Sequence, residues 1–168
     1  NDPTRTDILS MLMAARDEKG QQMDDRELRD QLMSLLLLGY ETTAAALAWA
    51  FYLIHSHPQA RDRLQQELNN ADNTQPDAIA QLPYLTAVCQ ESLRVHPIAL
   101  ICTPRMVRDC VQIVGDKFHA GTIIVPCIYL AHRKVETYSQ PEKFQPERFL
   151  QQKFSPFEYL PFGGGSRG

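Results

Sequence analysis

One uninterrupted helical pattern constrains more than any other feature how this chain can fold. It covers roughly 30 residues, from Asp25 to about His55, and Pro58 stops it. Asp24, followed three residues later by Glu27, predicts a capping box at its start. At about 1.5 Å per residue, such a helix is roughly 45 Å long. The sequence therefore predicts one helix that is long enough to cross a whole domain.

Two environments could hold this helix, a bilayer or a protein core. Its stretch from Leu32 to Ile54 is apolar on most sides and long enough for a transmembrane span. Glu41 lies at the centre, however, where a charge costs roughly 2.5–3.5 kcal/mol even on the mild insertion scale. Gly39, Thr42 and Thr43 cluster beside it. A buried central helix with a polar notch explains this pattern better than a membrane span.

The remaining patterns predict helices first and strands later. Shorter helices are expected after Pro58 and from Pro83 to Pro97, and the apolar and β-branched segments that follow are typical of strands. The last third, from Glu136, is rich in Pro and aromatic residues with little periodicity, which indicates an ordered meander. We therefore expect a mainly α fold with a small β-sheet. The helical part covers residues 1–97, the small sheet 98–130, and the meander with the start of a loop 131–168.

Net charge and the spacing of Cys and His argue against several classes of function. The net charge of −3 argues against a general nucleic-acid binder and against a protein that binds anionic membranes. The four Cys are scattered without C-x-x-C spacing, which favours buried free thiols over a zinc site or a disulfide framework. The five His show no metal-ligand spacing either.

The polar notch of the long helix is the first motif that could carry chemistry. It reads Gly39-Tyr40-Glu41-Thr42-Thr43. Glycine removes side-chain bulk, so something flat could approach the backbone there. A Thr hydroxyl can bond the carbonyl one turn back, and an acid beside a hydroxyl in an apolar helix can pass protons. The alternative is a helix kink with a buried polar pair.

The second motif is Glu91-x-x-Arg94, whose two side chains lie on one helix face. An exposed pair of this type would be a solvated surface pair worth little. The neighbouring residues are apolar, however, and a buried pair needs a further partner to satisfy it.

The third motif is the final stretch, Phe162-Gly163-Gly164-Gly165-Ser166-Arg167-Gly168. A glycine-rich loop that carries one Arg is suited to cradle something flat and anionic.

In order and spacing, these motifs resemble the cytochrome P450 family over essentially the whole chain. The family loop reads Phe-Gly-x-Gly-x-Arg-x-Cys, and its Cys thiolate ligates haem iron. Phe162, Gly163, Gly165 and Arg167 match, so the axial Cys is expected immediately after Gly168 and no metal ligand is expected before it. The resemblance implies a partial P450 fold, with a long central helix, a Glu-x-x-Arg helix, a small sheet and a meander. It also implies that the chain is the C-terminal half of a longer enzyme, in a partial gene or a partial record.

The resemblance assigns catalytic roles to the long helix. Thr42 would hold dioxygen at the iron, Glu41 would relay protons, and Gly39 would leave room for the oxygen. Leu38 departs from the small residue that is usual at the first position of this motif.

It assigns a structural role to the second motif. Glu91 and Arg94 would form one network with Arg148, from the segment Pro-Glu-Arg-Phe, and this network would pin the meander to the core. The pair His132-Arg133 fits a short His-Arg element of the family, which we interpret as packing and hydrogen bonding rather than ligation.

It also implies contacts to haem and to substrate. Arg105 and Arg167 would meet the haem carboxylates, because the planar guanidinium binds a carboxylate bidentately. The implied cofactor-binding residues are Gly39, Thr43, Arg105, Phe162, Gly163, Gly165 and Arg167. The implied substrate contacts are all apolar, which indicates a hydrophobic substrate, although each would serve equally as core: Met33, Leu37, Leu38, Ile98, Ala99, Leu100 and Ile101.

The implied function is that of a haem-thiolate monooxygenase. It would insert one atom of O2 into a hydrophobic substrate such as a fatty acid, an alkane or a terpenoid, with electrons from NAD(P)H through a ferredoxin- or flavodoxin-type donor or reductase. A cytoplasmic, bacterial-like location is expected, and membrane attachment stays open. The 168-residue chain alone is expected to be inactive. The alternatives are an inactive haem-free fragment and a helical interaction module.

Overall fold

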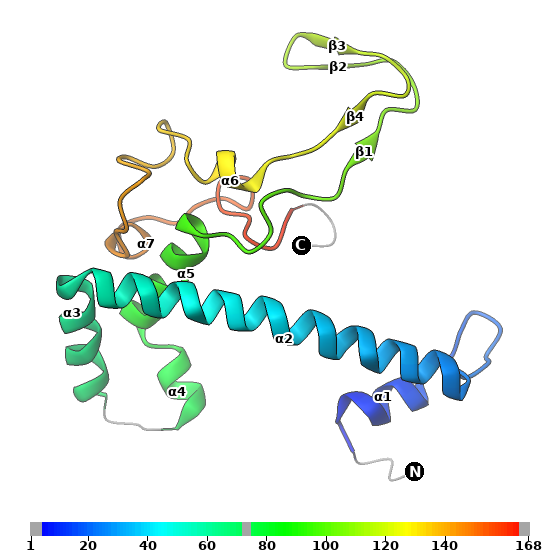
Figure 1. Cartoon of the computed structure of the whole chain (residues 1–168), viewed down its shortest axis with the longest axis horizontal. Coiled ribbons are helices and arrows are strands. Elements are labelled where there is room, and N and C mark those ends of the chain that lie inside the picture. Colours follow the sequence, from blue (N-terminus) through cyan, green and yellow to red (C-terminus); the bar gives the residue numbers. More distant parts are fainter. Residues whose placement is uncertain (1–4, 72–74, 165–168) are drawn as a thin grey trace. The chain divides into compact units, whose positions relative to one another are not determined.

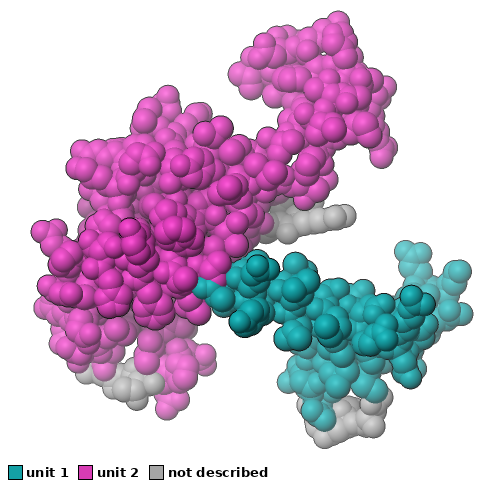
Figure 2. Space-filling view, viewed as in Figure 1, with its two compact units in different colours: residues 1–44 teal, residues 45–168 magenta. Residues whose placement is uncertain are grey.

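The computed structural model describes residues 5–71 and 75–164 of the chain (Figure 1). The chain divides into two compact units, residues 1–44 and residues 45–168, which Figure 2 colours separately. We describe each unit by itself. The boundary between them falls inside the long helix α2, Asp25–Ser56.

Two helices account for the first unit, and both begin at side-chain caps. Helix α1, Ile8–Ala14, begins at Asp7, whose Oδ1 accepts the Ser10 amide proton at 3.0 Å. Helix α2 begins with the predicted capping box: the Glu27 amide donates to Asp24 Oδ1 at 2.7 Å, and the Asp24 amide donates to Glu27 Oε2 at 3.0 Å. The predicted long helix is confirmed almost to the residue, because both of its ends carry local signals.

The burial expected for α2 is not what the described residues provide. Leu53 is its one buried residue, and the side chains of Leu36, Leu37 and Leu38 are about two-thirds exposed. By length and composition alone α2 could also cross a membrane, but the core helix of a soluble protein passes the same test. The apolar first half of α2 is therefore a surface that the described part of the chain leaves uncovered.

The second unit has its core where the end of α2 meets two further helices, α3 (Pro58–Asn69) and α5 (Pro83–Val95). Both begin with the predicted Pro in their first turn. Helix α5 packs against α3 and against α7, Glu147–Gln151. The buried cluster draws one side chain from the meander and the rest from these helices: Leu53, Ala60, Leu64, Tyr84, Val88, Val95 and Phe144.

Three short helices were not predicted. They are α4 (Pro76–Ala80), α6 (Ile128–Ala131) and α7, and each is too short to show a hydrophobic period. Helix α6 begins within the range expected for the sheet, and α7 lies in the expected meander.

The predicted small sheet consists of two separate two-stranded ribbons. Strands β1 (Arg105–Met106) and β4 (Ile123–Ile124) pair antiparallel, and so do β2 (Val111–Ile113) and β3 (Asp116–Phe118). The apolar segment before them forms a single bridge, from Ile101 to Cys127. The β2–β3 hairpin turns at Val114 and Gly115, with φ of 52° and 94°. Two positive φ angles in a two-residue loop are the pattern of a type I′ turn.

Candidate functional site

Helix α5 presents Glu91 and Arg94 on the face that it buries. Spacing of three residues places both side chains on one side of the helix, and apolar residues of the same face are buried beside them. Both residues are 0% exposed, and Arg148 from α7 is 7% exposed. The structure therefore brings together, in the interior, the three charged residues of the expected network.

The contacts among the three are short and directional. Arg94 Nε donates to Glu91 Oε2 at 2.7 Å, and Arg94 Nη2 donates to Glu91 Oε1 at 2.8 Å. Arg148 Nε donates to the same Oε1 at 3.0 Å. Two guanidiniums share one carboxylate, so the cluster carries a net positive charge that needs further acceptors.

Backbone carbonyls of the meander supply those acceptors. Arg94 donates to the His132 carbonyl at 2.8 Å and to the Lys143 carbonyl at 3.1 Å. Arg148 Nη1 donates to the Ser139 carbonyl at 3.2 Å. The Gln145 amide in turn donates to Glu91 Oε1 at 2.9 Å. These contacts hold four points of the irregular meander backbone against the buried charged cluster, so the network shapes that backbone rather than merely pairing charges.

Tyr138 completes the cluster. It is 0% exposed, and its ring centroid lies 5.0 Å from Arg94 Cζ and 5.9 Å from Arg148 Cζ. Its hydroxyl donates to the Glu158 carbonyl at 2.9 Å. Burial raises the pKa of this phenol. Tyr138 thus stays a neutral donor that links the charged cluster to the segment before the terminal loop.

His132 makes a second link, by the packing and hydrogen bonding predicted for it, although its partner was not predicted. The Leu160 amide donates to His132 Nε2 at 2.9 Å, and the ring of Tyr159 stacks on the imidazole at 5.5 Å. Burial, followed by the charge of Arg94, lowers the pKa of His132 to about 4. The His132-Arg133 pair was the available signal, but no pattern in the sequence indicates which amide the imidazole would meet.

The terminal loop passes beside the segment that leads into β1. Gly163 has a φ of 89°, a conformation that L side chains rarely adopt, and a Cβ placed on it would lie 4.0 Å from Cys102 Sγ. Phe162 is 85% exposed. Gly165 and Arg167, which were expected to bind cofactor, lie outside the described residues.

Arg105 stands in β1 with an exposed side chain. Its guanidinium has no hydrogen-bond or ion-pair partner among residues 5–71 and 75–164. Just before it, Ala99, Leu100 and Ile101 are exposed, whereas Ile98 is half-buried. This part of the second unit therefore offers an unpaired cation next to an apolar edge.

The polar notch lies in the first unit, on the exposed part of α2. Glu41, Thr42 and Thr43 are all exposed, as are Leu37 and Leu38. Thr42 Oγ1 donates to the Leu38 carbonyl one turn back, so its single proton is already engaged. A Cβ added at Gly39 would meet nothing within 4 Å, so the backbone there faces open space.

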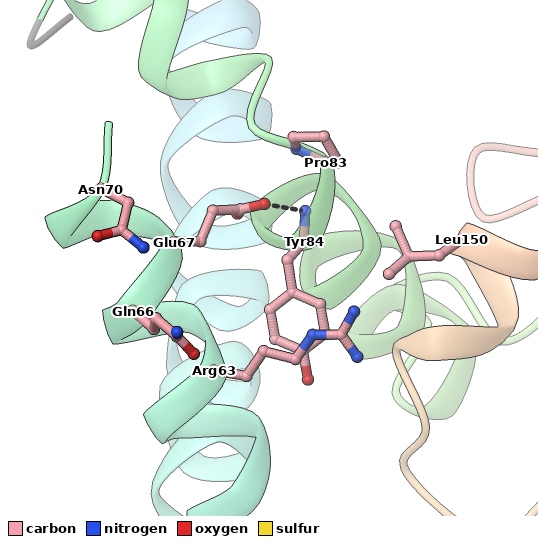
Figure 3. A pocket seen from close by; sticks show the side chains of 7 residues that line it. All are labelled: Arg63, Gln66, Glu67, Asn70, Pro83, Tyr84 and Leu150. Atoms are coloured by element: carbon pink, nitrogen blue, oxygen red, sulfur yellow. Dashed lines mark hydrogen bonds between the residues drawn. The ribbon is translucent and has the colours of Figure 1, made fainter. Parts of the chain in front are cut away.

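A further pocket of about 260 Å³ lies between α3 and α5 and reaches Leu150 (Figure 3). Glu67 points across it to the first turn of α5 and accepts the amide protons of Tyr84 and Leu85 at 2.7 and 2.8 Å. Arg63 donates to Glu147 at 2.9 Å and lies over the Tyr84 ring at 4.4 Å. Glu67 is satisfied by these two amides and Arg63 by Glu147, so the pocket is a structural junction between helices rather than a candidate site.

Comparison with known proteins gives consistent matches. The family model for cytochrome P450 matches residues 1–168. Cytochrome P450 135B1 of Mycobacterium tuberculosis is 40% identical over 163 residues, which make up 97% of this chain and 34% of that protein. Cytochrome P450 4F5 of Rattus norvegicus is 34% identical over an aligned length of 170, which covers 96% of this chain and 32% of that protein.

A solved structure agrees. The retinoic acid bound cyanobacterial CYP120A1 matches with a TM-score of 0.87 and 35% identity, over 98% of this chain and 39% of that chain. The chain spans about a third of the length of the curated relatives that it matches.

Proposed function

The chain belongs to the cytochrome P450 family, and from this membership we propose that it is part of a haem-thiolate monooxygenase, which inserts one atom of O2 into a hydrophobic substrate. The observation that carries the proposal is the family match over every residue of the chain. A monooxygenase of this family needs a porphyrin, two electrons and an apolar binding site.

The residues of the second unit fit a porphyrin. Arg105 is an exposed cation without a partner in the described part of the chain, which suits it to a haem carboxylate. Gly163 keeps the loop backbone in a conformation that favours glycine and leaves no side chain in the way of a flat ligand. We propose that these residues, with Phe162, Gly165 and Arg167, hold the haem, and that the axial Cys follows Gly168.

We propose that the polar notch, Gly39 to Thr43, transfers protons during the reaction. Haem, when bound, supplies the iron that activates O2 with two electrons delivered from NAD(P)H by a ferredoxin- or flavodoxin-type donor or reductase. Thr42 Oγ1 donates a hydrogen bond to the Leu38 carbonyl, which leaves its lone pairs to accept a hydrogen bond from a water. Glu41, the exposed acid next to Thr42, would pass protons from solvent to this water. The open backbone at Gly39, beside Thr43, leaves space for oxygen and for this water.

The proposed substrate is hydrophobic. Six of the seven side chains expected to touch it are exposed and apolar, and so are available to line a binding site: Met33, Leu37, Leu38, Ala99, Leu100 and Ile101. Fatty acids, alkanes and terpenoids have this character. The structural relative was solved with retinoic acid, a largely apolar molecule, which is compatible with the same class.

We further propose a cytoplasmic protein.

We expect the 168-residue chain by itself to be inactive. Its relatives are about three times as long, and the notch-bearing half of α2 is left uncovered by the described residues. A pocket whose walls are incomplete cannot exclude water from the reaction.

The test is the spectrum of the full-length protein. Reduced and exposed to carbon monoxide, it should show a Soret band shifted far to the red, as thiolate-ligated haem does, and replacement of the Cys after Gly168 by Ser should abolish this band. A well-folded full-length protein without the band would refute the proposal and favour a haem-free helical interaction module.

A further inference from the structure

We propose that His132 is a positioning residue: its neutral imidazole accepts the Leu160 amide proton and thereby ties the start of the terminal loop to the Glu91 network. The proposal rests on the proposed function in one respect only, namely that this loop leads to the haem ligand.

One residue makes both ends of the link. The His132 carbonyl accepts from Arg94 Nη1 at 2.8 Å, and the His132 ring accepts from the Leu160 amide at 2.9 Å. His132 also closes α6, since its own amide donates to the Ile128 carbonyl at 2.9 Å. A residue held at its backbone on both sides, and 0% exposed, has little freedom to move its ring. The charged network therefore fixes the position of Leu160 through one rigid imidazole.

The hydrogen bond fixes the protonation state of the ring. An amide N–H can only donate, so Nε2 must be the unprotonated nitrogen and Nδ1 must carry the hydrogen. A proton on Nε2 would face the Leu160 N–H directly. Arg94 and Arg133 are the cations that face the ring, and the neighbouring aromatic groups are Tyr138 and Tyr159. Two cations and burial all disfavour an imidazolium.

Other bonds hold nearby points of the same segment, which makes a matched comparison possible. Tyr159 donates its hydroxyl to the Gln90 carbonyl at 3.2 Å, and Tyr138 donates to the Glu158 carbonyl at 2.9 Å. The Gly163 amide donates to the Leu160 carbonyl at 3.0 Å. Leu160 is thus the residue through which the His132 link reaches Gly163, two residues before the undescribed end of the loop.

The experiment replaces His132 in the full-length protein and follows the Leu160 amide by hydrogen exchange. His132→Phe keeps a flat ring to stack on Tyr159 but has no acceptor, so exchange at Leu160 should accelerate about tenfold or more. His132→Gln places a carbonyl oxygen near the position of Nε2 and should restore protection. Tyr159→Phe removes a neighbouring bond yet keeps the imidazole, and should leave the Leu160 amide protected.

A second measurement, the reduced carbon-monoxide spectrum, reports on the haem ligand. In His132→Phe a larger share of the reduced carbon-monoxide form should lack the far-red Soret band, while His132→Gln and Tyr159→Phe keep it. Unchanged Leu160 exchange in a folded His132→Phe variant, or equal acceleration in Tyr159→Phe, would overturn the proposal. A wild-type protein that lacks the band altogether refutes the monooxygenase proposal instead, and the exchange comparison still decides the role of His132.

The wild-type protein gives an independent test that needs no variant to fold. Nitrogen NMR with labelled histidine should find His132 as the Nδ1–H tautomer at neutral pH. The Nε2–H tautomer, or a charged ring, is incompatible with the proposed bond.

Discussion

At the scale of single residues, Glu91 is the charge on which the interior of the second unit depends. Two guanidiniums and one backbone amide converge on its carboxylate, and none of the three charged residues is more than 7% exposed. A buried ion pair adds little to stability compared with apolar residues, but removing one partner leaves the other charges buried without compensation. We therefore expect a large loss of stability when Glu91 is replaced, although the ion pair itself adds little.

The first prediction is that Glu91→Gln lowers the free energy of unfolding by about 3–5 kcal/mol, because an amide cannot neutralise Arg94 and Arg148. Denaturant unfolding of the protein and its variant measures this. The control is Glu142→Gln: Glu142 is 74% exposed and lies 3.4 Å from Arg133, so its loss should change stability by less than about 0.5 kcal/mol. Similar effects of the two substitutions would contradict the account.

The second prediction concerns pH. The pKa of His132 is about 4 in the folded protein and about 6.5 in the unfolded chain, so the unfolded state binds a proton that the folded state refuses. The contribution of His132 is complete above about pH 6.5 and is lost as the pH falls toward 4. His132→Gln takes up no proton. The difference in unfolding free energy between wild type and this variant should therefore change by about 3 kcal/mol from pH 7 to pH 4, to the disadvantage of the wild type. A parallel pH dependence in the two proteins would contradict it.

At the scale of elements, helix ends explain what the sequence could predict. Asp7, Asp24 and the Pro residues that open α3 and α5 are local signals, and each marks a helix start in the structure. Helix α4 also begins with a Pro, but α4, α6 and α7 have only four or five residues, which is too short to show a hydrophobic period, so tertiary contacts define them. The ribbons escaped prediction as separate sheets for the same reason, since strands of two or three residues carry no alternation.

The third prediction tests the junction of α3 and α5. Glu67 caps two amides at the first turn of α5 although it belongs to α3, and its negative charge also suits the positive end of that helix dipole. Glu67→Ala should lower the free energy of unfolding by about 1–2 kcal/mol. Asp62→Asn on the same helix is the control, because among the described residues Asp62 pairs only with its exposed neighbour Arg61 and should matter by less than about 0.5 kcal/mol. An equal loss in both variants would contradict the capping role.

At the scale of the whole molecule, the candidate site could be predicted only in parts. The Glu91 network follows from helical spacing and the family motif, because i and i+3 share a face in any helix. The link from His132 to Leu160 joins residues 28 positions apart through a ring nitrogen and a backbone amide, which leaves no trace in sequence.

The fourth prediction follows from the exposed half of α2. Leu36 and Tyr40 are 66% and 75% exposed, next to Leu37 and Leu38. An apolar surface of this kind attracts hydrophobic dyes and other copies. The 168-residue chain should therefore enhance the fluorescence of an apolar dye severalfold more than the full-length protein does. Leu36→Gln with Leu37→Gln should reduce the signal, whereas Val135→Gln, at an exposed side chain outside α2, should not. Equal fluorescence from the short and full-length chains would contradict this.

The tip of the β2–β3 hairpin offers a practical handle. Val114 is 99% exposed and holds a positive φ that a branched side chain adopts reluctantly, so nothing in the described structure relies on its methyl groups. Loop tips of this kind accept insertions and chemical conjugates with the least disturbance. A fluorophore attached through Val114→Cys, after the exposed native thiols have been replaced, would report on tumbling and association without touching the buried arginines.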